Sequence, residues 1–368
     1  MTMKDIFKGI SLKLKIPAGL IGSKTLIKSQ ISTEYEERMA QEKKEYLEKY
    51  AEFTEDEPLF ERTSDSWGYI EQATQKLIRE KVGFSQWEYV INQASQIEKP
   101  EMLSLGSGPC GVEISIAEKI TSNYHYHCLD LNEELLGIGK KQIEKKGLNI
   151  STEPMDLNLI SLEEKKYDII TAFASLHHLN ELERVYTMVN RALKPDGIFV
   201  TVDVITKNGL MMWPETYDVL VRLWSIWPDK FKINHTYYGT PRFTPEYGNI
   251  DYSQGSFEGI RSQDILPLIP EYFDPIIYVP CHSICRQLLD TQYGPNYNLD
   301  DPFDKSMVEF IWNLDCYYIH ERVLPPGTMF AVMRKKGTAN PKIVAEVAGH
   351  MNADSRARQV RWIGHTRS

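Results

Sequence analysis

The chain has 368 residues, more than a single domain of about 150 residues needs, and its apolar (42%) and charged (25%) fractions are typical of globular proteins. The formal net charge of −9 excludes the basic surface of a nucleic-acid-binding protein, because acidic residues repel phosphate backbones. The five cysteines are odd in number and thinly spread, which favours a reducing cytoplasm over a secreted disulfide framework. No run approaches the roughly 20 apolar residues of a transmembrane helix, so we expect a cytoplasmic protein with a small-molecule partner.

Residues 1–64 are predicted to form an N-terminal arm and a surface helix. The first thirty residues carry six lysines among scattered aliphatic side chains. This pattern is typical of an extension packed on its own domain, although it also suits contact with an anionic membrane surface. From Ser32 onward glutamates alternate with lysines and arginines, as on a solvated helix.

Between residues 101 and 205, short apolar runs alternate with amphipathic segments. This alternation predicts repeated strand–helix units and a parallel sheet. The expected strands are 102–105, 126–129, 150–155, 168–173 and 198–204, and two helices are expected before them, between residues 65 and 99. A turn is predicted at residues 194–197, because proline presets φ and glycine tolerates positive φ.

Residues 206–259 break this rhythm with eleven aromatic side chains interrupted by prolines. We interpret this stretch as an inserted lid over a sheet that resumes with strands near 276–278 and 328–334. The main domain is therefore expected to span 65–336. The basic, weakly periodic segment 337–368 is predicted to be a mobile tail.

The strongest local motif is a strand that runs into glycines 106, 108 and 111 and then into a helix. Glycine allows the sharp bend and the close approach of a ligand, and a helix N-terminus offers N–H groups to ligand oxygens. Asp130 ends the next strand, at about the distance along the chain where a carboxylate accepts both ribose hydroxyls. Asp156 ends the third strand, where it either contacts adenine or caps a turn. Spacing alone does not separate a nicotinamide dinucleotide from another adenosine ligand.

These motifs, followed by residues 167–179 (YDIITAFASLHHL) and 192–202 (ALKPDGIFVTV), resemble in order and spacing the class I S-adenosylmethionine-dependent methyltransferases. The resemblance is close over residues 65–205 and looser over 258–335. It implies an α/β, Rossmann-like fold with a seven-stranded, mostly parallel sheet of order 3-2-1-4-5-7-6, an antiparallel last strand and helices on both faces. It also implies S-adenosyl-L-methionine as the cofactor.

Carried over residue by residue, the resemblance implies a set of cofactor contacts. In this set the glycine loop holds the amino-acid half of the cofactor and the end of the second strand holds the ribose. The end of the third strand flanks adenine, and the end of the fourth lies beside the sulfonium. The residues are Gly106, Ser107, Gly108, Asp130, Leu131, Asp156, Leu157, Ala174 and Ser175. Pro109 and Cys110 stand where many relatives carry glycine or another small residue.

Candidate catalytic residues follow the fourth and fifth strands. His177 and His178 have side chains whose usual pKa suits a general base, although a histidine at a helix start is as often structural. Asp203 either orients a substrate group or accepts from the backbone. Cys281, His282 and Cys285 are close in sequence, but no second ligand pair follows, so no metal is expected.

The aromatic lid is the expected acceptor site. Trp224, Trp227, Tyr237 and Tyr238 are the candidate substrate-binding residues, with the alternative that they form the lid's own core. The function predicted from these residues is methyl transfer to an oxygen, nitrogen or carbon of a small, partly apolar acceptor. An NAD(P)-dependent oxidoreductase and a non-catalytic cofactor-binding scaffold remain as alternatives, and a homo-oligomer is left open.

Overall fold

A single seven-stranded sheet organises the computed structural model, which describes residues 33–50, 53, 57–60, 63–236 and 240–360, without the side chains of 356–360. The chain divides into two units, Met1–Glu37 and Arg38–Ser368, and the sheet lies in the second. Residues from 38 onward thus belong with the sheet, whereas the sequence predicted a boundary at 64. The lysine-rich arm lies outside the described residues.

The strand order β3-β2-β1-β4-β5-β9-β8 is the expected 3-2-1-4-5-7-6 order. Strands β1 to β5 pair in parallel, and β9 pairs antiparallel with both β5 and β8, so the predicted fold class is confirmed. The strands are β1 (Glu101–Leu105), β2 (His125–Asp130), β3 (Ile150–Pro154), β4 (Tyr167–Phe173), β5 (Leu193–Val204), β8 (Phe273–Cys281) and β9 (Thr328–Lys335).

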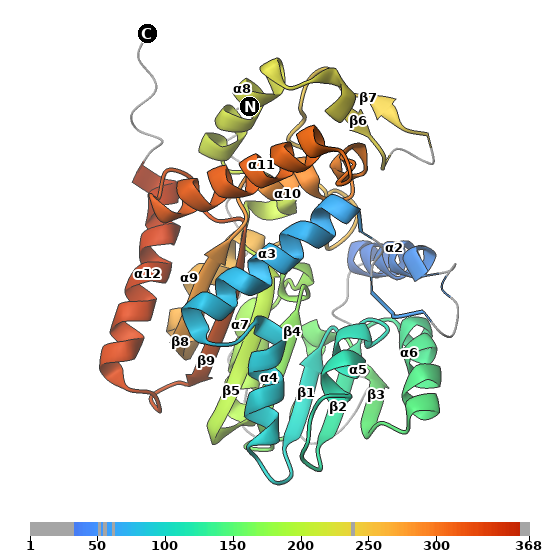
Figure 1. The fold of residues 1–368 in the computed structure, drawn as a ribbon. Helices are drawn as coiled ribbons and strands as arrows, with labels where there is room; N and C mark the ends of the chain where they lie inside the picture. The colour runs from blue at the N-terminus through green and yellow to red at the C-terminus, as the bar shows by residue number, and fades with distance from the viewer. Residues whose placement is uncertain (1–32, 51–52, 54–56, 61–62, 237–239, 361–368) are drawn as a thin grey trace, which may run out of the picture. The chain divides into compact units, whose positions relative to one another are not determined.

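Helices cover both faces of this sheet (Figure 1). One face packs on α3 (Asp65–Val82), α4 (Gln86–Ser95), α5 (Gly111–Ala117) and α6 (Glu133–Lys146). The other packs on α7 (Leu182–Ala192), α9 (Ser262–Tyr272) and α12 (Pro341–Val360). Neighbouring strand residues serve opposite faces, as the two-residue repeat of a strand requires: Met102 belongs to the first core and Leu103 to the second.

The segment between β5 and α9, which the sequence predicted to be a lid, does not form a core of its own. It contains α8 (Pro214–Ile226) and the short pair β6 (Ile233–Asn234) and β7 (Arg242–Phe243). Its aromatic side chains share one core with α10 (Cys285–Leu289), α11 (Pro302–His320) and the start of α3. Figure 1 shows α8, α10 and α11 beyond the carboxyl ends of the parallel strands.

Two predicted segments differ in the structure. Residues 194–197 do not end one element before another begins; they bulge within β5, because Tyr167 pairs with Leu193 while Ile169 pairs with Ile198. In place of a mobile tail from residue 337, residues 341–360 form α12. This helix buries Met351 completely, and the hydroxyl of Tyr278 on β8 lies 2.8 Å from Oδ2 of Asp354.

No helix in the described part of the chain has the length and apolar character needed to cross a bilayer. Helix α2 (Thr33–Tyr50), the acidic helix expected on the surface, begins in the first unit and continues into the second.

A carboxyl group is buried under the glycine loop. Glu113 on α5 is 2% exposed, and its Oε1 accepts a hydrogen bond of 2.6 Å from the Ser104 hydroxyl. Among the described residues its Oε2 has no hydrogen-bond partner. Burial raises the pKa of Glu113 to about 7, against an ordinary 4.5.

We expect this carboxyl to make the folded protein less stable as the pH rises. Between pH 4.5 and 7 the folded protein holds a proton that the unfolded chain has released, so stability falls with pH across this window. The fall is about 3 kcal/mol. Glu113→Gln cannot ionise and should lack this component, which urea unfolding of both proteins at pH 5 and pH 8 measures. Equal losses in the two proteins would contradict the assignment.

Candidate functional site

The glycine loop bends the chain sharply at the end of β1. Gly106 and Gly108 have φ of +71° and +53°, and a Cβ on Gly106 would lie 2.5 Å from Cβ of Ser175. The backbone N–H groups of Gly106 and Ser107 both donate to the carbonyl of Leu129, at 2.8 and 3.1 Å. The loop is thus bound to β2 on one side and meets the end of β4 on the other.

Asp130 joins the glycine loop to the turn after β2. Its Oδ2 accepts from the N–H of Gly108 at 2.7 Å, and its Oδ1 accepts from the N–H of Asn132 at 2.8 Å. Each carboxylate oxygen has lone pairs beyond the one used, so further hydroxyl donors can be accepted. Burial raises the pKa of Asp130, and these N–H groups oppose that rise.

A pocket that encloses about 720 Å³, open solvent included, lies at this carboxyl edge between the ends of β1 and β4. Such a switch point between diverging connections is where open α/β sheets bind ligands. Eight of the nine residues predicted to contact a cofactor line it; Ser107 does not. The eight are Gly106, Gly108, Asp130, Leu131, Asp156, Leu157, Ala174 and Ser175.

Asp156 combines the two alternatives considered from the sequence. Its Oδ1 accepts from the N–H of Asn158 at 2.9 Å and so caps a short turn, while the residue also lines the pocket. Asn158 in turn accepts, through its side-chain oxygen, from the N–H groups of Asn180 and Glu181. These bonds connect the loops after β3 and β4.

Asp203 is a buried anchor for the turn after β4. Its Oδ2 accepts from the N–H groups of Ser175 and Leu176, and its Oδ1 lies 2.7 Å from Nδ1 of His177. Only 2% of Asp203 is exposed, and it does not line the pocket. Its place therefore favours positioning the pocket wall over contacting a substrate.

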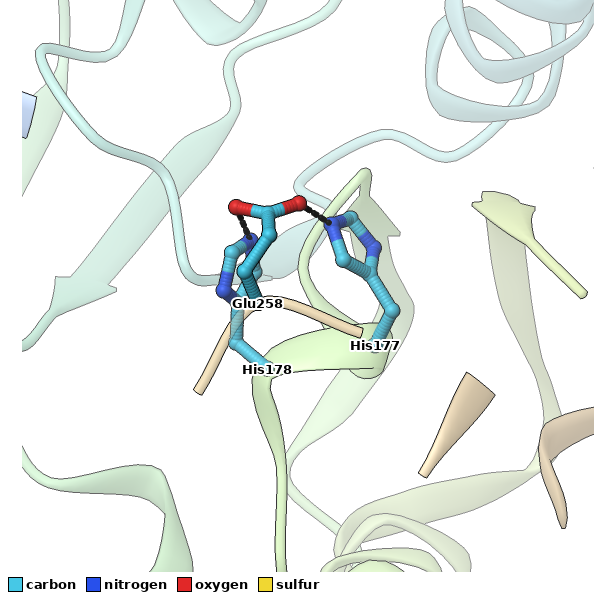
Figure 2. Close-up of side chains that lie close together, drawn as sticks. All are labelled: His177, His178 and Glu258. Carbon is cyan, nitrogen blue, oxygen red and sulfur yellow. Dashed lines mark ion pairs between the residues drawn. The ribbon is translucent and has the colours of Figure 1, made fainter. Parts of the chain in front are cut away.

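His177 and His178 lie in different surroundings. His178 lines the pocket, whereas His177 is buried, and Nε2 of His177 lies 3.5 Å from Oε1 of Glu258. Glu258 also faces Nε2 of His178 across 3.9 Å, so one carboxylate lies between both rings (Figure 2). Burial opposes a charge on His177, but Asp203 and Glu258 outweigh it and raise its pKa to about 10.

Helix α2 supplies a wall of the pocket that the sequence did not reveal. Glu42, Lys43 and Tyr46 line it. Oε2 of Glu42 accepts from the N–H of Phe257 at 2.8 Å, and one Arg38 nitrogen donates to two carbonyls of the adjoining loop. Alternating charges predicted only a solvated helix, and nothing in that pattern distinguishes the face that meets the pocket.

Trp224 and Trp227 do not line this pocket, and they match the alternative that they form the core of the lid. Trp224 and Trp227 are almost fully buried in the core that the lid shares with α10 and α11. The indole N–H of Trp224 donates to the carbonyl of Thr244, and that of Trp227 donates to the Tyr297 hydroxyl. Tyr237 and Tyr238 lie outside the described residues.

Residues 281–285 form a structural turn. The ring nitrogens of His282 lie 2.8 Å from the hydroxyls of Thr74 and Thr328, and burial lowers its pKa to about 3. Both cysteines of this segment are buried free thiols. In the part of the chain that the structure describes, the side chains close enough to share a metal ion are instead His177, His178 and Glu258.

Comparison with known proteins gives one match at the level of a family. Residues 102–197 match the model of a methyltransferase domain. The ubiquinone/menaquinone biosynthesis C-methyltransferase of Brucella abortus (strain S19) is 26% identical over 118 residues, which cover 32% of this chain and 44% of that protein. The ubiquinone biosynthesis O-methyltransferase of Coxiella burnetii (strain Dugway 5J108-111) is 28% identical over 69 residues, or 19% and 30% of the two chains. The match thus spans less than half of either relative.

Solved structures also resemble this chain. A SAM-dependent methyltransferase from Aquifex aeolicus is 20% identical with a TM-score of 0.30, over 37% of this chain and 72% of that one. The [4+2]-cyclase SpnF is 14% identical with a TM-score of 0.47, over 83% and 96%. The family model covers β1 to β4 and the first residues of β5, so this part of the chain matches a methyltransferase domain, and the strand order of the whole sheet is the order that the sequence motifs predicted.

Proposed function

We propose that the protein uses S-adenosylmethionine to methylate a small, partly apolar acceptor. The observation that carries this proposal is the pocket at the carboxyl edge of the sheet, where the glycine loop and the acids after β2 and β3 meet. The bound cofactor would supply an electrophilic methyl carbon on its sulfonium. The chain's own contribution is then to hold the donor and the acceptor in line and to exclude water.

The residues of the pocket fit this cofactor. Where Gly106 approaches Ser175, there is no room for a side chain, so the loop presents bare backbone to the amino-acid half. Asp130 keeps acceptor capacity for two ribose hydroxyls, and Asp156 with Leu157 offers a carboxylate beside an apolar surface for adenine. Ala174 and Ser175 then lie beside the sulfonium.

The acceptor is proposed to enter on the side where His178, Leu179 and Phe257 line the pocket. Apolar and titratable side chains meet there, which suits a partly apolar molecule that loses a proton. The names of the two curated relatives assign methylation of carbon to one and of oxygen to the other. Both atoms therefore remain candidates here, together with nitrogen.

Asp130→Ala tests the cofactor assignment. We expect S-adenosylmethionine to bind about 10- to 150-fold more weakly, because hydrogen bonds to a charged group contribute about 1.5–3 kcal/mol. Isothermal titration calorimetry measures this change. Asp218→Ala is the matched control, since Asp218 pairs with Arg222 on the exposed surface of α8.

Unchanged affinity in Asp130→Ala would contradict the ribose assignment. A thermal shift with NAD⁺ or NADP⁺ in place of S-adenosylmethionine would favour the oxidoreductase. Tight cofactor binding without methylation of any quinol, phenol or amine acceptor would favour the scaffold.

A further inference from the structure

Three side chains from two distant segments direct their polar atoms at one point beside the pocket. His177 and His178 come from the turn after β4, and Glu258 comes from the loop before α9 (Figure 2). One ligand atom from each lies within 4.8 Å of those from the other two. Neither the cofactor contacts nor the packing of the sheet uses this arrangement.

The distance from each histidine nitrogen to the Glu258 carboxylate is close to the distance between two ligand atoms bound to the same metal ion. Nε2 of His177 and Nε2 of His178 are 3.5 and 3.9 Å from the two oxygens of Glu258, longer than a good hydrogen bond. Two ligands that lie about 2.1 Å from one tetrahedral ion are about 3.4 Å apart. The Tyr46 hydroxyl lies 3.1 Å from Nε2 of His178, which is also close to the distance between two ligands of one ion.

Each imidazole ring has a carboxylate near its other nitrogen. Nδ1 of His177 is hydrogen-bonded to Asp203 at 2.7 Å, whereas Nδ1 of His178 lies 3.1 Å from Glu42 without the alignment of a hydrogen bond. A carboxylate on the far nitrogen is the usual partner of a metal-binding histidine, because it sets the tautomer and orients the ring. The carboxylates of Asp203, Glu42 and Glu258 lie around the two rings. The ammonium group of Lys49 is also near enough to interact electrostatically with Glu258.

We propose that Nε2 of His177, Nε2 of His178 and the Glu258 carboxylate bind one divalent transition-metal ion. Two imidazoles and one carboxylate match Zn²⁺ or Fe²⁺, whereas Ca²⁺ and Mg²⁺ prefer oxygen ligands alone. Because His178 lines the pocket, an ion at this point would lie next to the side on which the acceptor is proposed to enter. The sequence predicted no metal, since two adjacent histidines and a glutamate eighty positions later form no recognisable ligand spacing.

The role of this ion rests on the proposed function. An acceptor hydroxyl bound to the ion would lose its proton to water more readily, since a bound cation stabilises the oxyanion. That oxygen's electron pair would then form the bond to the methyl carbon, and the pair of the broken carbon–sulfur bond would remain on sulfur. The site thus selects an acceptor that offers a hydroxyl, phenol or enol oxygen.

Calorimetric titration of ZnCl₂ into the untagged, EDTA-treated full chain tests the proposal. We expect one ion per chain in the wild type and at least 100-fold weaker binding in Glu258→Gln. His127→Gln is the matched control, because His127 also faces a glutamate, Glu153, at 3.2 Å but on the sheet between β2 and β3. Its Zn²⁺ affinity should equal that of the wild type.

Two further measurements separate the possible failures. Cobalt(II) should give the visible absorption of an ion with nitrogen and oxygen ligands in the wild type and lose it in Glu258→Gln. S-adenosylmethionine affinity without metal should be the same in both, since Glu258 does not line the pocket, and this shows that the variant is folded. Equal Zn²⁺ binding by all three proteins, or no Zn²⁺ binding by the wild type, would overturn the metal site. Failure of the wild type to bind S-adenosylmethionine would instead overturn the proposed function.

Discussion

Asp203→Ala is expected to lower the free energy of unfolding by about 3–5 kcal/mol, the range for breaking a buried charged pair. The carboxylate accepts from the N–H groups of Ser175, Leu176 and Val204 and faces His177. Alanine leaves all of these donors buried without an acceptor. Chemical unfolding followed by circular dichroism measures the loss.

The same change should also weaken cofactor binding, because it releases the pocket wall formed by Ala174 and Ser175. Asp315 is the matched control. It is fully buried and accepts from the N–H groups of Ser283, Ile284 and Cys285, but it does not line the pocket. Asp315→Ala should therefore lose comparable stability and keep its cofactor affinity per folded molecule. Equal affinity losses in the two variants would show that Asp203 acts only on stability.

Gly106→Ala is expected to reduce both cofactor affinity and kcat/KM by about 100-fold, as a displacement of about 1 Å at a reacting site can do. The new Cβ would lie 2.5 Å from Cβ of Ser175, and the φ of +71° is strained for alanine. Ser175 has to move, although its hydroxyl donates to the carbonyl of Leu105 at 2.7 Å. Calorimetry and steady-state methyl-transfer assays measure the two effects.

Gly137→Ala is the control for that substitution. Gly137 lies within α6, and a Cβ there would meet no atom within 4 Å. Alanine is favoured over glycine inside a helix, so this variant should be as stable as the wild type or more stable, with full cofactor affinity. Normal cofactor binding by Gly106→Ala would mean that the glycine loop can adjust. The proposed close contact between its backbone and the cofactor would then be wrong.

The parts of the fold that the sequence predicted are those whose signals are local. Each parallel strand is a short apolar run, and each site residue on β1, β2 and β3 follows directly where such a run ends. The parallel pairing then brings Gly106, Asp130 and Asp156 to one edge, so their shared pocket follows from the strand order. The order itself came from resemblance to a family, since periodicity does not specify which strands are neighbours.

The errors concern elements whose place depends on distant partners. The pattern of Trp224 and Trp227 showed aromatic residues but not which segment they pack on, and α10 and α11 come some sixty residues or more later. The apolar side chains of helix α12 show little helical periodicity, and the helix is held by burying Met351 and by the contact of Tyr278 with Asp354. The contribution of α2 to the pocket could not be predicted for the same reason, since only the folded chain brings Glu42 next to Phe257.

Because residues of α2 line part of the pocket, sequence similarity to relatives describes only the other part of it. The methyltransferase model covers residues 102–197, which hold the glycine loop and the acids of the donor side. Tyr46 and Phe257, which line the pocket near the proposed acceptor entrance, both lie outside that segment. Two proteins can therefore share the donor half almost unchanged and still act on different acceptors. If the acceptor enters as proposed, α2 and the loop before α9 are the segments in which a change of sequence would alter the choice of acceptor.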